Sequence, residues 1–261
     1  MNKIILGNCA TDLEKIPDES IQLVVTSPPY GTDLRTCYNS DVDYVALRNV
    51  LYRKMKTGGV VVWNEQDGTS EGRKTLDSFK HCLLFCEEGF FNCFEHCIYH
   101  KHGRPGPWWN RRFRVDHEYL FMMIKGDKPS HFDKSHLAHK INPYVNKGTT
   151  RKSDGSFAET SGKETDEKSQ GTVFFYNPSN LEAFPFKADK LQHPATMPEQ
   201  MPMDFIRCFT KEGDLVYDPF VGSGTVMRAA KRLNRRYLGH EISEEYVILA
   251  NKLLKTIKPR L

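Results

Sequence analysis

Short apolar runs alternate along this chain with longer stretches in which apolar residues recur at helical spacing. The apolar runs at residues 21–25 and 60–63 predict buried strands, because consecutive apolar residues suit a sheet that is covered on both faces, and residues 3–6 predict a further short strand. Further strands are predicted at residues 91–99, 117–124, 172–176, 215–217 and 237–240. The segment at 117–124 is expected to be an antiparallel partner in the sheet.

Helical spacing predicts the elements between these strands. They lie at residues 11–16, 43–55, 73–87, 199–210, 225–233 and 244–255. Gly58-Gly59 is expected to end the second helix, because glycine commonly follows a helix terminus. Strands that alternate with helices are typical of a mostly parallel α/β sheet with helices on both faces.

The character of the chain changes after residue 125. Residues 147–170 are mainly Lys, Ser, Thr, Gly, Asp and Glu, and Phe157 is almost their only large apolar residue. Such a composition cannot build its own core, so it predicts a flexible loop or linker. We therefore divide the chain into residues 1–126, an insertion at 127–190 and residues 191–261.

Length and charge set wide limits on function. The 261 residues fit one large domain, or one core with a smaller insertion. The net charge of +4 suits a polyanionic partner without requiring one. No apolar run reaches membrane-spanning length, and the first residues lack a signal-peptide pattern, so the cell interior (the cytoplasm) is the expected location.

Four of the seven cysteines, Cys82, Cys86, Cys93 and Cys97, lie close together with histidines among them. Their spacing does not give the paired Cys-x-x-Cys knuckles of structural zinc sites. Buried cysteines are the favoured interpretation, and a zinc site is the alternative. We therefore predict no metal.

The most informative stretch is Thr26-Ser27-Pro28-Pro29-Tyr30, which follows the predicted strand at 21–25. Two consecutive prolines cannot continue a strand, so they hold the chain in a stiff, extended form. In an open α/β sheet, the carboxyl end of a strand is where ligands bind. The stretch therefore presents hydrogen-bond acceptors beside an aromatic ring at a ligand-binding edge.

A second motif, Asp218 to Thr225, follows the predicted strand at 215–217 and contains Gly222-Ser223-Gly224. Glycines allow a backbone to approach a ligand closely, and a helix N-terminus favours an anionic group. Glu241 ends the next predicted strand, where an acidic residue can bind ribose hydroxyls. Glu65-Gln66-Asp67 lies at the carboxyl end of the predicted strand at 60–63. Either a cofactor-positioning role or a solvated loop explains these residues.

These two motifs resemble those of DNA methyltransferases that modify an exocyclic amino group. Their order, with Thr-Ser-Pro-Pro-Tyr first and the glycine loop last, is similar to the circularly permuted β class, and the resemblance covers residues 2 to about 257. It implies the seven-stranded, Rossmann-like class I methyltransferase fold, circularly permuted. It also implies S-adenosyl-L-methionine (SAM) as cofactor and direct methyl transfer to a base extruded from double-stranded DNA.

The resemblance also implies roles for individual residues. The catalytic residues would be Ser27, Pro28, Pro29 and Tyr30. The cofactor-binding residues would be Asn8, Thr26, His193, Asp218, Phe220, Gly222, Ser223, Gly224, Thr225 and Glu241. Asn8 would contact adenine where the family commonly has an acidic residue, and an ordinary turn asparagine explains it equally well.

A basic, tryptophan-containing stretch follows the predicted strand at 91–99. Its candidate DNA-binding residues are Arg104, Trp108, Trp109, Arg111, Arg112 and Arg114. Arginines suit phosphates and indole rings suit base stacking, whereas a Trp pair packed under a loop is the alternative. The family position of residues 127–190 implies target recognition.

Ser27 favours cytosine N4 as the target, because the family's N6-adenine enzymes usually have Asp at that position. N6-adenine methylation is the alternative, and a catalytically inactive DNA-binding protein of the same fold is a further one. The resemblance also makes a cognate restriction endonuclease a candidate partner. We expect a monomer or a homodimer.

Overall fold

The computed structural model describes residues 2–29, 42–101, 110–176 and 197–257. The chain divides into two compact units. The first consists of Met1–Phe132 and Thr172–Leu261, and the second is Asp133–Gly171.

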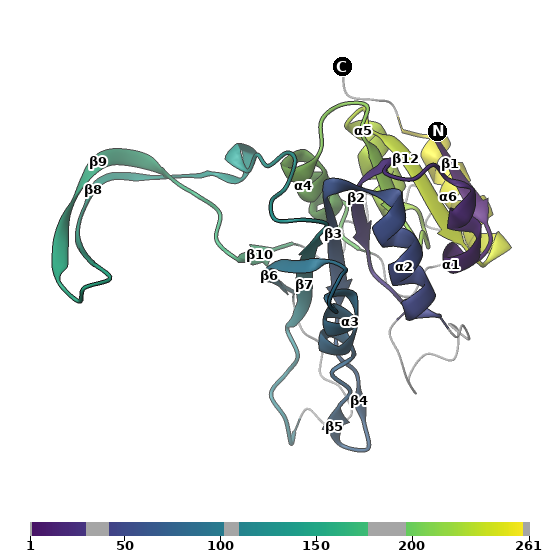
Figure 1. Ribbon diagram of the computed structural model, residues 1–261, viewed down its shortest axis with the longest axis horizontal. Helices are drawn as coiled ribbons and strands as arrows, with labels where there is room; N and C mark the ends of the chain where they lie inside the picture. The colour runs from purple at the N-terminus through teal and green to yellow at the C-terminus, as the bar shows by residue number, and fades with distance from the viewer. Residues whose placement is uncertain (1, 30–41, 102–109, 177–196, 258–261) are drawn as a thin grey trace. The chain divides into compact units, whose positions relative to one another are not determined.

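The first unit is built on an eight-stranded sheet (Figure 1). In spatial order its strands are β1 (Asn2–Leu6), β12 (Arg236–Glu241), β11 (Leu215–Asp218), β2 (Ile21–Thr26), β3 (Met55–Glu65), β7 (His117–Ile124), β6 (Asn92–His100) and β10 (Val173–Phe175). Within this sheet, β7 runs antiparallel to β3 and β6, and the other pairings are parallel. The mostly parallel sheet is confirmed, but the count of seven implied by the family leaves out β10.

Helices lie on both faces of this sheet. One group is α1 (Cys9–Asp12), the short 3-10 helix η1 (Leu13–Lys15), α2 (Tyr44–Lys54) and α3 (Asp77–Phe85). The other group is α4 (Gln200–Phe209), α5 (Thr225–Arg232) and α6 (Glu244–Lys255). Within each group the helices pack against their neighbours, and Figure 1 shows α2 and α3 in front of the strands.

Alternating side chains of the central strands point to opposite faces of the sheet and contribute to a hydrophobic core on each face. Val24 and Val61, which are paired across β2 and β3, belong to a buried cluster with Leu47 and Leu51 of α2. The residues on either side of Val24 are also fully buried but stand outside that cluster. Because successive side chains of a strand point to opposite faces, a second core lies on the other side.

Two predicted boundaries in this unit were wrong. Gly58 and Gly59 lie inside β3, where the Gly58 N–H donates to the carbonyl of Lys125 at 2.7 Å. A Cβ on Gly58 would lie 2.6 Å from the backbone nitrogen of Ser130, so these glycines permit a close approach of two chain segments. The helix predicted from residue 73 begins only at Asp77, because β5 (Arg73–Lys74) pairs with β4 (Thr69–Ser70).

The second unit contains strands where the composition predicted a flexible loop. β8 (His139–Arg151) and β9 (Phe157–Lys168) form an antiparallel pair, and η2 (Ser135–Leu137) precedes them. The turn between the strands is held by Asp154, whose Oδ1 accepts from the Ser156 backbone N–H at 2.8 Å. Gly155 follows with φ +86°, a conformation that favours glycine.

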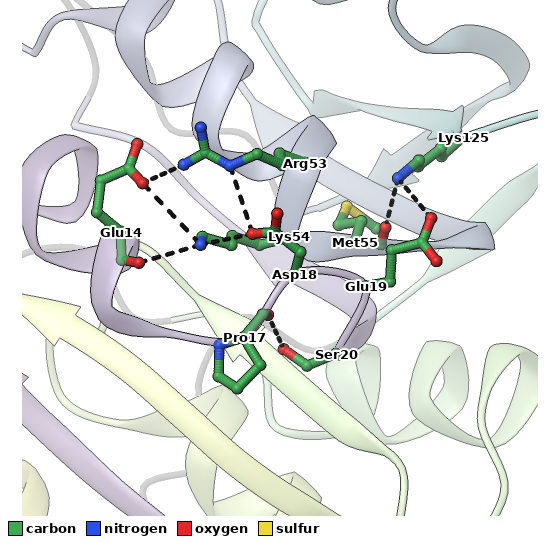
Figure 2. Close-up of polar contacts among 9 residues, drawn as sticks. All are labelled: Glu14, Pro17, Asp18, Glu19, Ser20, Arg53, Lys54, Met55 and Lys125. Atoms are coloured by element: carbon green, nitrogen blue, oxygen red, sulfur yellow. Dashed lines mark hydrogen bonds and ion pairs between the residues drawn. The ribbon is translucent and has the colours of Figure 1, made fainter.

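A polar network fixes the amino end of β2, opposite the edge that carries Ser27 (Figure 2). The nearly buried ammonium of Lys54 donates to Asp18 Oδ1 at 2.7 Å and to the Glu14 carbonyl at 3.0 Å. Arg53 pairs with the carboxylates of Glu14 and Asp18. The network ties the end of α2 to the segment before β2 and belongs to the scaffold.

Candidate active site

The two sequence motifs meet at one edge of the sheet. Ser27 directly follows β2, Asp218 ends β11 and Glu241 ends β12. Since β11 pairs in parallel with both β2 and β12, the carboxyl ends of the three strands are neighbours. Of the predicted catalytic residues, Ser27, Pro28 and Pro29 are described and lie at this edge.

A buried hydrogen bond joins the two motifs. Thr26 Oγ1 donates to Asp218 Oδ1 at 2.7 Å, and both side chains are almost completely buried. The Phe220 backbone N–H donates to the same oxygen at 3.0 Å. Thr26 therefore orients Asp218 through a contact between residues 192 positions apart, which no sequence pattern predicted.

Asp218 is electrostatically unusual. Burial raises the pKa of its carboxyl to about 7, the bonds from Phe220 and Thr26 act to lower it, and the charge of Glu241 raises it further. A cationic group beside this carboxyl would stabilise its ionised form.

Glu241 organises the loop that follows β11. Its Oε2 accepts from the Gly222 backbone N–H at 2.8 Å, and its Oε1 accepts from the Ser243 backbone N–H at 3.0 Å. Each carboxylate oxygen has two lone pairs, so both can still accept from hydroxyl groups of a ligand.

Gly224 has a role in the scaffold. It has φ +82°, and a Cβ there would lie 2.9 Å from the Cβ of Ala250 in α6. Glycine at this position therefore lets the loop turn into α5 and lets α5 pack closely against α6.

Arg228 supports the loop through hydrogen bonds, and it was not among the residues predicted from the sequence. This buried guanidinium donates to the Ser223 carbonyl at 2.9 Å and to Thr225 Oγ1 at 3.3 Å. Burial lowers the pKa of Arg228, and Glu199, 3.6 Å away, supplies the opposing charge. An arginine inside a helical pattern resembles an ordinary exposed residue, so no sequence signal distinguished it.

Asn8 acts as the N-cap of α1. Its Oδ1 accepts from the Ala10 backbone N–H at 2.8 Å, as the turn interpretation predicted. The cap uses one lone pair of Asn8 Oδ1 and leaves the second, so the adenine contact through this acceptor stays a prediction.

Several predicted residues lie outside the described part of the chain, namely Tyr30, Arg104, Trp108, Trp109 and His193. The described members of the basic stretch, Arg111, Arg112 and Arg114, are exposed. Arg112 donates to the Gly72 carbonyl, which joins this stretch to the β4–β5 turn.

In the described part of the chain, no group of three or more His, Cys, Asp or Glu side chains could hold a metal ion. The described helices include none that is long and apolar enough to cross a membrane.

The family described as DNA methylase, N6_N4_Mtase, matches residues 21–252. The matched span begins at β2 and contains Ser27, Asp218 and Glu241. This chain belongs to that family of DNA methylases.

The comparison with individual proteins agrees with this membership. The DNA methylase is 39% identical over 249 residues to the orphan methyltransferase M.BamHII of Bacillus amyloliquefaciens, and the alignment covers 93% of this chain and 91% of M.BamHII.

Two solved structures share its fold. The PvuII DNA methyltransferase (cytosine-N4-specific) has a TM-score of 0.72 at 21% identity, covering 99% of this chain and 87% of that one. M1.HpyAVI, solved as a SAM complex, has a TM-score of 0.61 at 20% identity, covering 97% of this chain and 99% of that one. At these identities the likeness concerns the class I methyltransferase fold.

Proposed function

We propose that this DNA methylase transfers a methyl group from SAM to the exocyclic N4 amine of cytosine in double-stranded DNA. The observation that carries the proposal is the position of Ser27. It follows Thr26, which is hydrogen-bonded to Asp218 at the end of the neighbouring strand. A hydroxyl that can orient an amine therefore stands beside a carboxylate that suits a cationic methyl donor.

The residues at this edge fit SAM. The hydrogen bonds from Thr26 and Phe220 both go to Asp218 Oδ1, so Oδ2 can face a positive group. Glu241, at the end of the next strand, retains lone pairs for ribose hydroxyls. When bound, SAM supplies the methyl group, and the glycine loop, Asn8 and His193 complete the proposed cofactor set.

The chain's own contribution to the chemistry is to bind and orient the amine. The nitrogen lone pair of an exocyclic amine is delocalised into the base, so it is a poor nucleophile. The Ser27 hydroxyl and the Pro28 carbonyl would accept from its two N–H groups and turn the lone pair out of the ring plane. Pro29 keeps these acceptors in place, and Tyr30 would stack on the extruded base.

DNA contact is assigned to the basic stretch. The exposed guanidinium groups of Arg111, Arg112 and Arg114 suit phosphates, with Arg104 and the two tryptophans completing the set. Recognition of the target sequence is assigned to residues 127–190. N6-adenine methylation is the second candidate function, because the matched family includes both kinds of amino methylase.

The catalytic assignment is tested by Ser27→Ala. We expect transfer to slow by about 10- to 100-fold, because the lost contact acts mainly in the transition state, while the affinities for SAM and DNA stay unchanged. Single-turnover kinetics with titration calorimetry measure both quantities.

Ser20→Ala is a matched control at the opposite end of β2, where the Ser20 hydroxyl donates to the Pro17 carbonyl at 2.7 Å. Equal transfer rates for the two variants would contradict the assignment of Ser27 as a catalytic residue.

A further inference from the structure

A buried carboxylate–imidazole pair lies beside the proposed site. Glu65, the last residue of β3, is completely buried, which excludes the solvated-loop interpretation. Its Oε2 accepts from Trp63 Nε1 at 2.8 Å and lies 2.8 Å from His81 Nδ1 of α3. Its Oε1 has no hydrogen-bond partner among the described residues.

The pair is close to both sequence motifs. Trp63 is paired with Thr26 across β2 and β3, and Glu65, two residues further, ends β3 at the edge of the sheet where Ser27 follows β2. The Trp63 ring lies edge-on to Phe220 of the cofactor motif, at 6.3 Å between ring centroids, and its centroid lies 5.8 Å from that of the His81 ring. Trp63 therefore connects the cofactor motif to the Glu65–His81 pair.

The contact with Glu65 determines which ring atom His81 offers to a ligand. His81 Nδ1 lies 2.8 Å from Oε2 of the buried Glu65 side chain. Nε2 is therefore the ring nitrogen that remains for a ligand, and an imidazole Nε2–H is a hydrogen-bond donor.

The surroundings hold the imidazole in one orientation. The Tyr44 ring lies against it at a centroid distance of 4.0 Å, and Trp63 contacts it from β3. The His81 side chain is 15% exposed, whereas Glu65 is completely buried. A fixed, partly exposed ring nitrogen beside a buried carboxylate is suited to a polar contact with a ligand.

We propose that His81 donates from Nε2 to the ring nitrogen beside the amino group of the extruded base, which is N3 in cytosine. This inference rests on the proposed function, because Ser27 and Pro28 take up the amine's two N–H groups and leave the adjacent acceptor without a donor. A buried acceptor without a donor is costly, so the contact would favour a correctly seated base.

The test compares DNA affinities, so it does not depend on turnover. The target site is first located by sequencing methylated DNA. Duplexes are then made with the target cytosine or with 3-deazacytosine, which has C–H in place of N3. For the parent chain, we expect this replacement to weaken binding about tenfold more than it does for His81→Asn, which keeps a donor near Glu65 and loses Nε2–H.

His81→Gln places an amide donor near the position of Nε2 and should keep much of the discrimination. Arg48→Met is the control, because Arg48 also ties α2 to α3, through the Leu84 carbonyl at 3.0 Å, and should leave the discrimination unchanged. A purely structural histidine would instead lower the melting temperature of both His81 variants and leave the discrimination at the parent value, which overturns the proposal.

If His81→Asn does not fold, Glu65→Gln takes its place, since removing the carboxylate charge should reduce the discrimination in the same way. Unchanged discrimination in that variant would also overturn the proposal. Product analysis separates this inference from the proposed function. If the methylated base is adenine, the cytosine assignment fails, and the same comparison is made with 1-deazaadenine.

Discussion

At Asp218, burial raises the pKa of the carboxyl, whereas the charge of a cationic ligand would lower it. Burial raises its pKa to about 7, against a usual value near 4, so the folded chain binds a proton here more tightly than the unfolded chain does. The resulting loss of stability is absent below about pH 4, grows as the pH rises and is complete above about pH 7. A cation bound beside the ionised carboxylate offsets that loss.

This predicts that SAM affinity rises with pH. For a group with a pKa near 7, the ionised fraction increases about eightfold between pH 6.0 and pH 7.5, and we expect the SAM association constant to follow it. Titration calorimetry at the two pH values measures the change. Asp218→Asn should bind more weakly at pH 7.5 with a flat profile, and a parent-like profile in that variant would show that another group titrates.

Gly224 combines a positive φ with a close approach to α6. Gly224→Ala should lower the free energy of unfolding by about 1–2 kcal/mol for the positive φ, with a further 1–3 kcal/mol from the contact with Ala250. Gly213→Ala is the control, because Gly213 has φ +80° but no atom within 4 Å of an added Cβ. Equal losses in urea unfolding would mean that α5 and α6 do not pack as described.

Residues whose position follows from a local motif were the ones whose placement the sequence predicted best. Asp218 and Glu241 were expected at strand ends and lie there. Arg228 and the Glu65–His81 pair were missed, because their roles come from contacts between segments that are distant in sequence. No periodicity or short motif contains that information.

Among the elements, the end of α2 is held by charge. Lys54 is nearly buried between Asp18 and the Glu14 carbonyl (Figure 2). Replacing a buried charged group by an apolar one of similar size can be nearly neutral, whereas removing its partner leaves the charge uncompensated. Removing the Asp18 carboxylate should therefore cost more stability than replacing Lys54 by an apolar residue of similar size.

We expect Asp18→Ala to lower the melting temperature more than Lys54→Met, with the rate of methyl transfer unchanged in both variants. Thermal unfolding and a methyl-incorporation assay measure these quantities. Slower transfer in Lys54→Met at an unchanged melting temperature would contradict the assignment of this network to the scaffold.

The element boundaries that were predicted wrongly have local causes. Gly58 follows helical spacing but serves a close approach to Ser130 inside β3. The β8–β9 pair was hidden by its polar composition, although Asp154-Gly155 is a typical hairpin turn. Composition describes whether a segment can form its own core, and two strands that pair with each other can form without one.

At the scale of the whole molecule, the order of the chain differs from the order of the sheet. β11 and β12, which carry the cofactor motif and Glu241, come late in the sequence but lie between β1 and β2. Thr26 and Asp218 are 192 positions apart and are hydrogen-bonded. The sheet type was predictable from alternating elements, and this order was implied by family resemblance alone.

The identity of the methylated base tests the assignment of Ser27 to a cytosine amine directly. DNA from cells expressing the chain is digested to nucleosides and analysed by mass spectrometry, with DNA from cells expressing Ser27→Ala as the control. We expect N4-methylcytosine in the parent sample and strongly reduced amounts in the control. N6-methyladenine alone would contradict the assignment of Ser27 to a cytosine amine.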